Sequence, residues 1–183
     1  MTKAFLFFLL GCCLTTGSSA AELTKVGQLT PEFRFTTLAG KTTALNQLRG
    51  KVVLVNFFAT WCAPCMAEMP RLEQEIWRTL GTNGDLVVVA IGREHTRADL
   101  EQFLKKNSFS FLLAPDPKRE IYAKFATQGM PRNYLIDAAG HIVYQSEGYG
   151  EEEFKRLLQA VKKALAGNRG SATSARNSGQ KAI

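Results

Sequence analysis

The fold is decided by one stretch of the chain, residues 50–70, which reads Gly50-Lys51-Val52-Val53-Leu54-Val55-Asn56-Phe57-Phe58-Ala59-Thr60-Trp61-Cys62-Ala63-Pro64-Cys65-Met66-Ala67-Glu68-Met69-Pro70. Residues 52–58 form a nearly continuous apolar run after a Gly-Lys turn signal, which predicts a strand buried on both faces of a parallel sheet. Residues 63–80 repeat apolar side chains at helical spacing and predict a helix. Because Pro70 lies inside that helix and removes one backbone hydrogen bond, we expect a kink there. Cys62 and Cys65 therefore sit where a buried strand ends and a helix begins.

The Cys62-Ala63-Pro64-Cys65 motif has the position and spacing of a redox-active pair. The N-terminus of a helix carries unpaired N–H groups and partial positive charge, which stabilise a thiolate over a thiol. A lowered cysteine pKa would make Cys62 the nucleophile, while Cys65, further into the helix, would be the buried resolving thiol. Pro64 suits the first helical turn. We therefore expect Cys62 to attack a substrate disulfide and Cys65 to release the reduced product from the mixed disulfide.

Two other interpretations of this motif are weaker. A structural zinc site needs four ligands, and once the N-terminal segment is removed the chain offers only this cysteine pair, His95 and His141. A purely structural disulfide across so short a loop would restrict the unfolded chain very little. Redox catalysis is therefore predicted, with no metal and no cofactor. His95 and His141 are assigned to a loop and a turn, without a function.

Strands and helices alternate along the rest of the chain. Residues 31–45 alternate apolar and polar side chains around a turn and predict a β-hairpin at an edge. This order predicts an α/β fold, a three-layer α/β/α sandwich with a mixed sheet. Further strands are predicted at residues 86–91, 109–114, 131–137 and 141–147, and further helices at 96–107, 117–125 and 151–166.

Residues 1–20 have the pattern of a secretory signal peptide. A positive charge is followed by an apolar run and then by small residues, with cleavage expected after Ala20 or Ala21. The apolar run is shorter than the roughly 20 residues that span a bilayer. An alternative stays open, because the residues before Cys12 resemble a lipoprotein signal in which Cys12 is lipidated. Cleavage is favoured slightly, because it removes Cys12 and Cys13 and leaves no odd thiol.

The C-terminal residues 167–183 are rich in Gly, Ser, Ala and Asn and predict a disordered tail, which leaves residues 26–166 as one domain. The tail carries Arg169, Arg176 and Lys181 without an acid, so the formal net charge of +7 overstates the charge of the domain. No basic stripe interleaved with aromatic residues is present in the sequence, and nucleic acid is not expected as a partner.

The quoted stretch resembles the TlpA/ResA-like branch of bacterial envelope thiol–disulfide oxidoreductases, which have the thioredoxin fold. A second matching segment is Gly129-Met130-Pro131-Arg132-Asn133-Tyr134-Leu135-Ile136-Asp137, and the likeness covers roughly residues 26–166. The resemblance implies a thioredoxin fold with an N-terminal hairpin extension and a periplasmic disulfide reductase acting on protein substrates. It also implies a membrane thiol as electron donor, and a monomer is expected. Cytochrome c maturation is a common task in this family.

The resemblance also implies roles for particular residues. Pro131 would be a cis-proline facing the cysteine pair, leaving the backbone of Met130 free to pair with an extended substrate. Met130 departs from the family pattern, in which a β-branched residue is common before this proline. Trp61 would form part of the flat apolar surface around the sulfurs.

Glu68 is three residues beyond Cys65 and therefore on the same helix face. Taken alone it is more often a solvated helix charge. Relatives use a glutamate here near the thiols, which implies that Glu68 accepts or relays the proton of Cys65. Asn56 stands where ordinary thioredoxins place a buried aspartate, and an amide cannot titrate, so Glu68 is the nearest proton acceptor.

Two alternative functions come from other classes. A thiol peroxidase places Thr three residues before its reactive cysteine, and this chain has Ala59 there. A copper-carrying protein on the same fold generally has a longer spacing between its cysteines and a dedicated distal His or Met. Both alternatives are weaker than disulfide reduction.

Overall fold

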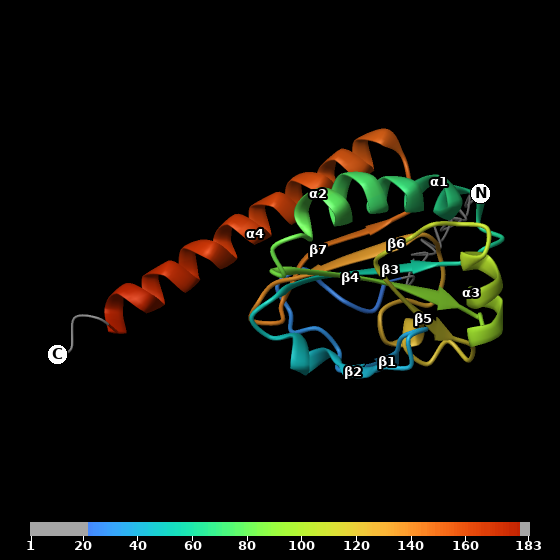
Figure 1. Ribbon diagram of the computed structural model, residues 1–183, viewed down its shortest axis with the longest axis horizontal. Helices are drawn as coiled ribbons and strands as arrows, with labels where there is room; N and C mark the ends of the chain where they lie inside the picture. The colour runs from blue at the N-terminus through green and yellow to red at the C-terminus, as the bar shows by residue number, and fades with distance from the viewer. Residues whose placement is uncertain (1–21, 180–183) are drawn as a thin grey trace, which may run out of the picture.

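Figure 1 shows the computed structural model of the protein, which describes the backbone of residues 22–179 and the side chains of residues 22–170. The predicted signal peptide and the alternative lipidation site Cys12 lie outside the described residues. In chain order the elements are β1 (Arg34–Thr36), β2 (Thr42–Ala44), a 3-10 turn η1 (Leu45–Leu48), β3 (Val52–Phe58), α1 (Ala63–Arg71), a π-helical segment η2 (Leu72–Trp77), α2 (Arg78–Leu80), β4 (Leu86–Arg93), α3 (Arg97–Leu104), β5 (Leu112–Asp116), a 3-10 turn η3 (Tyr122–Lys124), β6 (Arg132–Ile136), β7 (Ile142–Glu147) and α4 (Glu151–Gly179).

A five-stranded mixed sheet in the order β5-β4-β3-β6-β7 forms the centre of the molecule. β3 pairs in parallel with β4 and antiparallel with β6, and β7 pairs antiparallel with β6. Every residue of β3 is buried, because this strand has neighbours on both sides and covering layers on both faces. The predictions of a buried strand at residues 52–58 and of a late antiparallel hairpin are confirmed.

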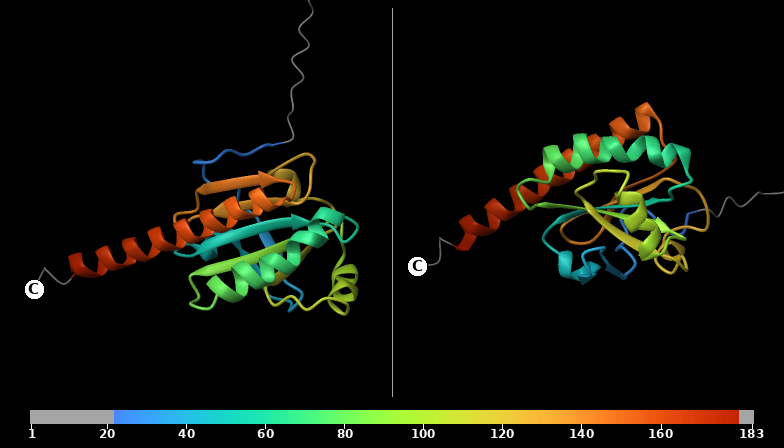
Figure 2. Two further views of the ribbon diagram at one scale, coloured as in Figure 1. Left: turned by 90° about the horizontal axis from the view of Figure 1, so that it is seen from above. Right: turned by 45° about the vertical axis from the view of Figure 1, so that its right-hand side comes forward.

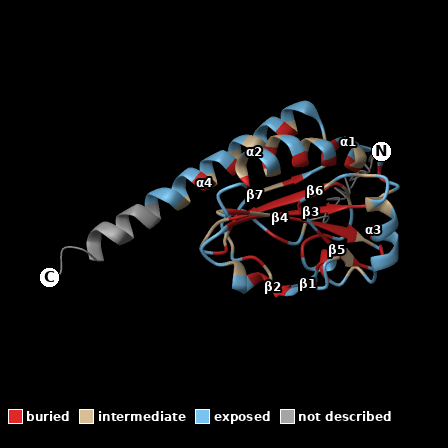
Figure 3. Cartoon of the chain, viewed as in Figure 1, coloured by how far each residue is buried: buried red, intermediate tan, exposed pale blue. Residues whose placement is uncertain are grey.

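Two different layers cover the faces of this sheet. α1, η2, α2 and α4 lie together on one face (Figures 1 and 2), where Leu54 and Phe58 of β3 share a buried cluster with Phe154 and Leu157 of α4. The alternate residues of β3, among them Phe57, point to the other face and pack against the β1–β2 hairpin and η3. Burial is accordingly densest along the central strands (Figure 3). The α/β fold class with a mixed sheet is confirmed, and the N-terminal hairpin forms a separate two-stranded sheet.

The helix predicted over residues 63–80 is present as three consecutive helical segments, α1, η2 and α2. Pro70 lies near the end of α1 and has no N–H to donate to the preceding turn. The N–H of Leu72 is shared between the carbonyls of Glu68 and Met69, and the π-helical segment begins at this residue. The helix thus accommodates the proline by a change in hydrogen-bond register.

The prediction of a helix at residues 117–125 is wrong, because only η3 is helical there. The Asp116 carboxylate accepts hydrogen bonds from the backbone N–H groups of Ile121 and Tyr122, which holds this segment in a turn. Arg119 has a φ of 61°, a left-handed conformation that cannot continue a right-handed helix. The strand predicted at residues 109–114 is shifted to β5, an edge strand in which Pro115 is tolerated.

The C-terminal helix is longer than predicted, and it projects past the sheet (Figure 1). The sequence predicts a disordered tail from Gly167, whereas α4 continues to Gly179. The tail contains no proline, so the helix can propagate past Gly167 and Gly170 at a cost of about 1 kcal/mol each. Asn168 also donates to the carbonyl of Gly50 at 3.1 Å, which holds this part of the helix to the domain.

Among residues 22–179, no helix combines the length and the apolar character needed to cross a membrane.

Candidate active site

The two cysteines form a disulfide at the N-terminus of α1. Cys62 caps the helix, and its Sγ accepts a hydrogen bond from the N–H of Cys65 at 3.3 Å. Cys65 is fully buried, whereas Cys62 retains 7% exposure. The central strand β3 leads into this turn and holds the pair at one end of the sheet (Figure 1). The predicted position between strand and helix is confirmed, and Cys62 is the more accessible of the two cysteines.

Glu68 is buried under α1, with 2% exposure. Its Oε1 accepts a hydrogen bond from Asn133 Nδ2 at 2.7 Å, and its Oε2 accepts one from Asn56 Nδ2 at 3.0 Å. It follows Cys65 by one helical turn on the same helix face. The alternative of a solvated helix charge is therefore wrong.

The two amide donors come from paired strands. Asn56 of β3 lies opposite Asn133 of β6 in the antiparallel register, and Asn56 Nδ2 also donates to Asn133 Oδ1 at 2.9 Å. Residues two apart on a strand share a face, so Asn56 lies on the same face as Leu54, under the helices. Sequence reasoning missed Asn133. The available signal was a polar residue inside a buried strand, two residues after Pro131.

Burial raises the pKa of Glu68 from its ordinary value of 4.5 to about 7. The main cause is lost hydration of the carboxylate, because burial penalises the charged form. The hydrogen bonds from Asn133 and Asn56 oppose this shift by stabilising the anion, and repulsion from Glu153 adds to it. A carboxyl group that titrates near neutral pH can both accept and return a proton there.

The segment before β6 is held on two sides. The Met130–Pro131 peptide bond is cis. Tyr122 Oη donates to the carbonyl of Gly129 at 2.7 Å, and Arg132 Nε donates to the carbonyl of Gln128 at 2.8 Å. Pro131 is buried, and Met130 packs against the buried cluster that includes both cysteines. The second matching segment of the sequence therefore lies at the same cluster as the disulfide.

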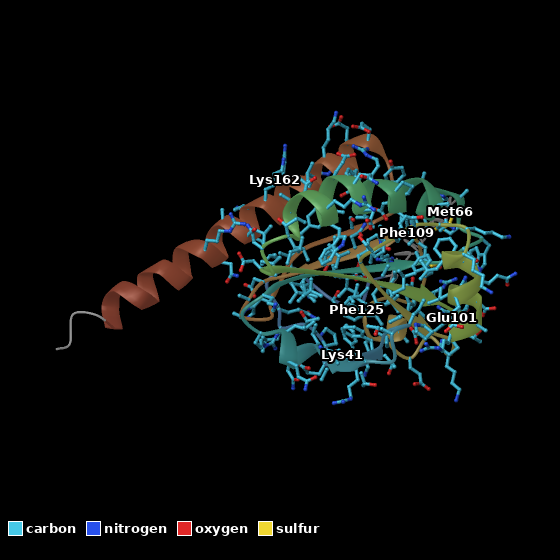
Figure 4. The ribbon with its side chains drawn as sticks, viewed as in Figure 1. Lys41, Met66, Glu101, Phe109, Phe125 and Lys162 are labelled. Atoms are coloured by element: carbon cyan, nitrogen blue, oxygen red, sulfur yellow. A yellow bond between two sulfur atoms is a disulfide. The ribbon has the colours of Figure 1, made fainter. Side chains whose placement is uncertain are left out.

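Trp61 is 64% exposed, next to the buried cysteine pair. The Arg93 guanidinium lies 5.6 Å from the centre of its ring. A groove of about 560 Å³ runs between Trp61 and α3, with Thr60 and Phe103 among its lining residues. Figure 4 shows this end of the molecule, where labelled Met66 and Glu101 mark α1 and α3.

His95 is a second residue that sequence reasoning missed. It lines the same groove, is 5% exposed, and its Nε2 lies 3.1 Å from the backbone nitrogen of Thr60. The sequence offers no periodic signal for it, because it follows β4 in a short loop. Among the described residues, no three His, Cys, Asp or Glu side chains are grouped to hold a metal ion.

Sequence comparison places these features in a family. The sequence matches the AhpC/TSA family over residues 26–145. It is 30% identical over 145 residues to thiol-disulfide oxidoreductase ResA of Bacillus cereus (strain ATCC 10987 / NRS 248), covering 79% of this chain and 82% of the relative. ResA of Bacillus anthracis is 31% identical over 144 residues, covering 79% and 80% of the two chains.

Solved structures agree with this assignment. A thiol:disulfide interchange protein of the thioredoxin family from Chlorobium tepidum TLS superposes with a TM-score of 0.65 at 26% identity, covering 78% of this chain and 98% of that one. The solution structure of a candidate protein disulfide isomerase from Bacteroides thetaiotaomicron superposes with a TM-score of 0.76 at 37% identity, covering 81% and 94%. This chain therefore belongs to the AhpC/TSA family and is a thiol–disulfide oxidoreductase with the thioredoxin fold.

Proposed function

We propose that this oxidoreductase reduces disulfides in protein substrates of the bacterial envelope, with Cys62 as nucleophile, Cys65 as resolving thiol and Glu68 as proton acceptor. The observation that carries this proposal is the buried Glu68 carboxyl group, which two asparagine amides hold one helical turn after Cys65. A group with a pKa of about 7 is suited to take a thiol proton at neutral pH and to return it later.

The reaction balances as a two-electron exchange. The Cys62 thiolate attacks one sulfur of the substrate disulfide, and the other substrate sulfur leaves as a thiolate. Glu68 takes the proton of Cys65, and the Cys65 thiolate then attacks Cys62 in the mixed disulfide. The first substrate sulfur leaves, so the substrate has gained two electrons and the enzyme holds the Cys62–Cys65 disulfide. A thiol donor must then return two electrons to the enzyme.

The division of labour between the cysteines follows from their surroundings. Cys62 is the helix cap and the more exposed cysteine, so it meets the substrate and benefits from the positive end of α1. Cys65 is fully buried, so it reacts only with a sulfur already attached to Cys62. Trp61, Met130 and Pro131 form the substrate-binding surface around them.

The envelope location, the membrane thiol donor and the monomeric state belong to the same proposal. The signal pattern of residues 1–20 and the resemblance to envelope oxidoreductases support them. Cytochrome c maturation is the task that we propose for the reductase, on the resemblance alone.

Mechanism-based trapping tests this function. In a strain that expresses Cys65→Ala, mixed disulfides with envelope proteins should accumulate and disappear on treatment with reductant. Cys62→Ala is the matched control and should trap far less. If both variants trap equally, the roles of the cysteines are wrong, and if acid-quenched alkylation finds the wild-type pair mostly oxidised in growing cells, the direction is wrong.

A further inference from the structure

His95 is a buried imidazole behind the active-site turn, and both of its ring nitrogens are engaged. Its Nε2 lies 3.1 Å from the backbone nitrogen of Thr60 and 2.8 Å from Thr60 Oγ1. Its Nδ1 lies 2.9 Å from the carbonyl oxygen of Arg93. The ring therefore links the end of β4 to the residue that precedes Trp61.

The direction of these hydrogen bonds fixes the protonation of the ring. A backbone N–H can only donate and a carbonyl oxygen can only accept. Nε2 must therefore be the unprotonated acceptor for Thr60, and Nδ1 must carry the proton that it donates to Arg93. A proton on Nε2 would place two donors face to face, so the hydrogen bond from the Thr60 N–H requires the tautomer with its proton on Nδ1.

The N–H of Thr60 needs an acceptor from outside the sheet. The ladder between β3 and β4 ends at the pair Phe58 and Gly92, before Thr60 is reached. An N–H that is partly shielded from water and has no acceptor is costly, and the His95 ring supplies the acceptor for Thr60. The N–H of Cys62 is bonded to the carbonyl of Ala59 at 3.1 Å. These two hydrogen bonds together hold the turn that carries Trp61.

The chain reverses sharply after β4 to deliver His95 to this position. The N–H of His95 donates back to the carbonyl of Gly92. A Cβ at Gly92 would lie 2.8 Å from Leu100 Cδ2 and 3.2 Å from His95 Cβ, so a larger residue there would displace the Leu100 side chain and crowd His95. Glu94 adopts a φ of 64° in the same turn, a strained conformation of the kind that is often found beside functional sites.

We propose that His95 is a positioning residue for thiol–disulfide exchange, which holds the Thr60–Trp61 turn so that exposed Trp61 docks the polypeptide segment that carries the reacting disulfide. The inference rests on the proposed function in one respect, the role of Trp61 in binding protein substrates. Because His95 touches neither sulfur in this scheme, its loss weakens the binding of a polypeptide and leaves the exchange chemistry at Cys62 in place.

The chain offers a matched control, because its only other histidine, His141, lies on the β6–β7 turn with a side chain that is 44% exposed. Four variants are compared with the wild type: His95→Leu, His95→Gln, His141→Leu and His141→Gln. Insulin serves as the protein disulfide and hydroxyethyl disulfide as the small one, with dithiothreitol as reductant.

His95→Leu should raise the KM for insulin about tenfold and change the rate with hydroxyethyl disulfide less than about twofold. His95→Gln keeps an acceptor for the Thr60 N–H and should restore the KM for insulin, and both His141 variants should match the wild type.

A measurement on the wild type tests the contact without any variant. Long-range ¹H–¹⁵N NMR spectra should show His95 as the Nδ1–H tautomer, and an Nε2–H tautomer would overturn the proposal even if His95→Leu fails to fold. An unchanged KM for insulin in His95→Leu, or equal KM values in His95→Leu and His95→Gln, overturns it as well. If the wild type does not reduce insulin, the proposed function is wrong, and the tautomer still decides whether His95 holds the turn.

Discussion

At the scale of single residues, one carboxyl group determines how the site should respond to pH. Glu68 would be an ordinary surface charge in an isolated helix, with a pKa near 4.5. Packing of α1 on the sheet removes its water and raises its pKa to about 7. Hydrogen bonds from two amides stabilise the Glu68 carboxylate, so Glu68 can still lose its proton near neutral pH.

The raised pKa of Glu68 predicts a pH-dependent loss of stability. Between about pH 4.5 and 7 the native protein keeps a proton that the unfolded chain has lost, so the free energy of unfolding falls as pH rises through this window. The loss approaches about 3 kcal/mol above pH 7. Glu68→Gln removes this titration, so its stability relative to the wild type should rise between pH 4.5 and pH 8 in urea unfolding of the oxidised protein. Exposed Glu120→Gln is the control, and a Glu68→Gln curve parallel to the wild type contradicts the burial argument.

Glu68→Gln should make the Cys62 thiol more acidic and yet slow the turnover of a protein disulfide. Above pH 7 the variant lacks a negative charge near the thiols, so the pKa of Cys62 should fall. Turnover of a protein disulfide should nevertheless drop roughly ten- to a thousandfold, because the proton of Cys65 loses its acceptor. Rates of iodoacetamide alkylation against pH give the first quantity, and insulin reduction gives the second. If neither the pKa of Cys62 nor the rate of insulin reduction changes, Glu68 takes no part in catalysis.

At the scale of elements, the pairing of β3 with β6 builds the surroundings of Glu68. The register places Asn56 opposite Asn133, and Glu68 of α1 accepts a hydrogen bond from each of the two amides. Each element contributes one polar side chain, and both Glu68 oxygens accept hydrogen bonds from the two amides inside an apolar cluster. Among the described residues, Asn56 Oδ1 has no hydrogen-bond partner. This arrangement explains how a carboxyl group is kept under the helix at all, because an unpaired buried carboxylate would be strongly destabilising.

Removing one of these donors should move the titration upward. Asn133→Ala deletes a hydrogen bond that stabilises the Glu68 anion, so the pKa of Glu68 should rise further above 7. The pH at which insulin reduction reaches half of its maximum should rise with it. Exposed Asn46→Ala should leave that midpoint unchanged. A midpoint that stays in place or falls in Asn133→Ala would show that the rate does not report on Glu68.

The same elements show what the sequence could predict. The apolar run of β3 carries a strong local signal, and the strand forms where expected. The helix predicted at residues 96–107 also forms, as α3 with Thr96 as its N-cap. The helix expected at residues 117–125 failed because the Asp116 side chain captures two N–H groups, a contact that periodicity cannot show. The cysteine pair was predictable because its spacing is local. Asn133 and His95 were not, because their roles depend on strand register and on a chain reversal.

At the scale of the whole molecule, α4 joins the domain along only part of its length. Its inward side chains Phe154, Leu157, Val161 and Leu165 are buried against the sheet face that also carries α1. Beyond them the helix projects past the sheet (Figure 2). Among the described side chains of α4, the buried ones lie in the part that covers the sheet, and their burial stabilises the domain.

Two changes in α4 should have very different effects on stability. Leu165→Ala opens a cavity in the core and should lower the free energy of unfolding by about 2–5 kcal/mol. Deletion of residues 171–183 should change it by less than about 0.5 kcal/mol, because the buried side chains described in α4 lie at or before Leu165. Urea unfolding of the two variants beside the wild type provides the comparison. A large decrease in the free energy of unfolding on deletion would show that residues 171–183 stabilise the domain.

The N-terminal segment is tied to the strand that follows Pro131 through Arg132. This guanidinium is 1% exposed and bonds Glu22 at 2.6 Å and Glu147 at 2.7 Å. Glu22 also accepts a hydrogen bond from Tyr134 Oη at 2.8 Å. The N-terminal segment and β7 are therefore joined around the buried Arg132 guanidinium, whose Nε donates to the carbonyl of Gln128 in the loop before Pro131.

Removing Glu22 should destabilise the protein and loosen that loop together. Glu22→Ala leaves the buried Arg132 charge with one anion fewer, at a cost of about 1–3 kcal/mol in the free energy of unfolding. Glu32→Ala breaks the exposed Glu32–Arg49 pair and is the control, with an expected cost below about 1 kcal/mol. Amide hydrogen exchange at Gly129 and Met130 should speed up in Glu22→Ala alone, because Arg132 loses part of its anchorage. Equal stability of the two variants, or unchanged exchange before Pro131, would show that the N-terminal segment does not support the active-site loop.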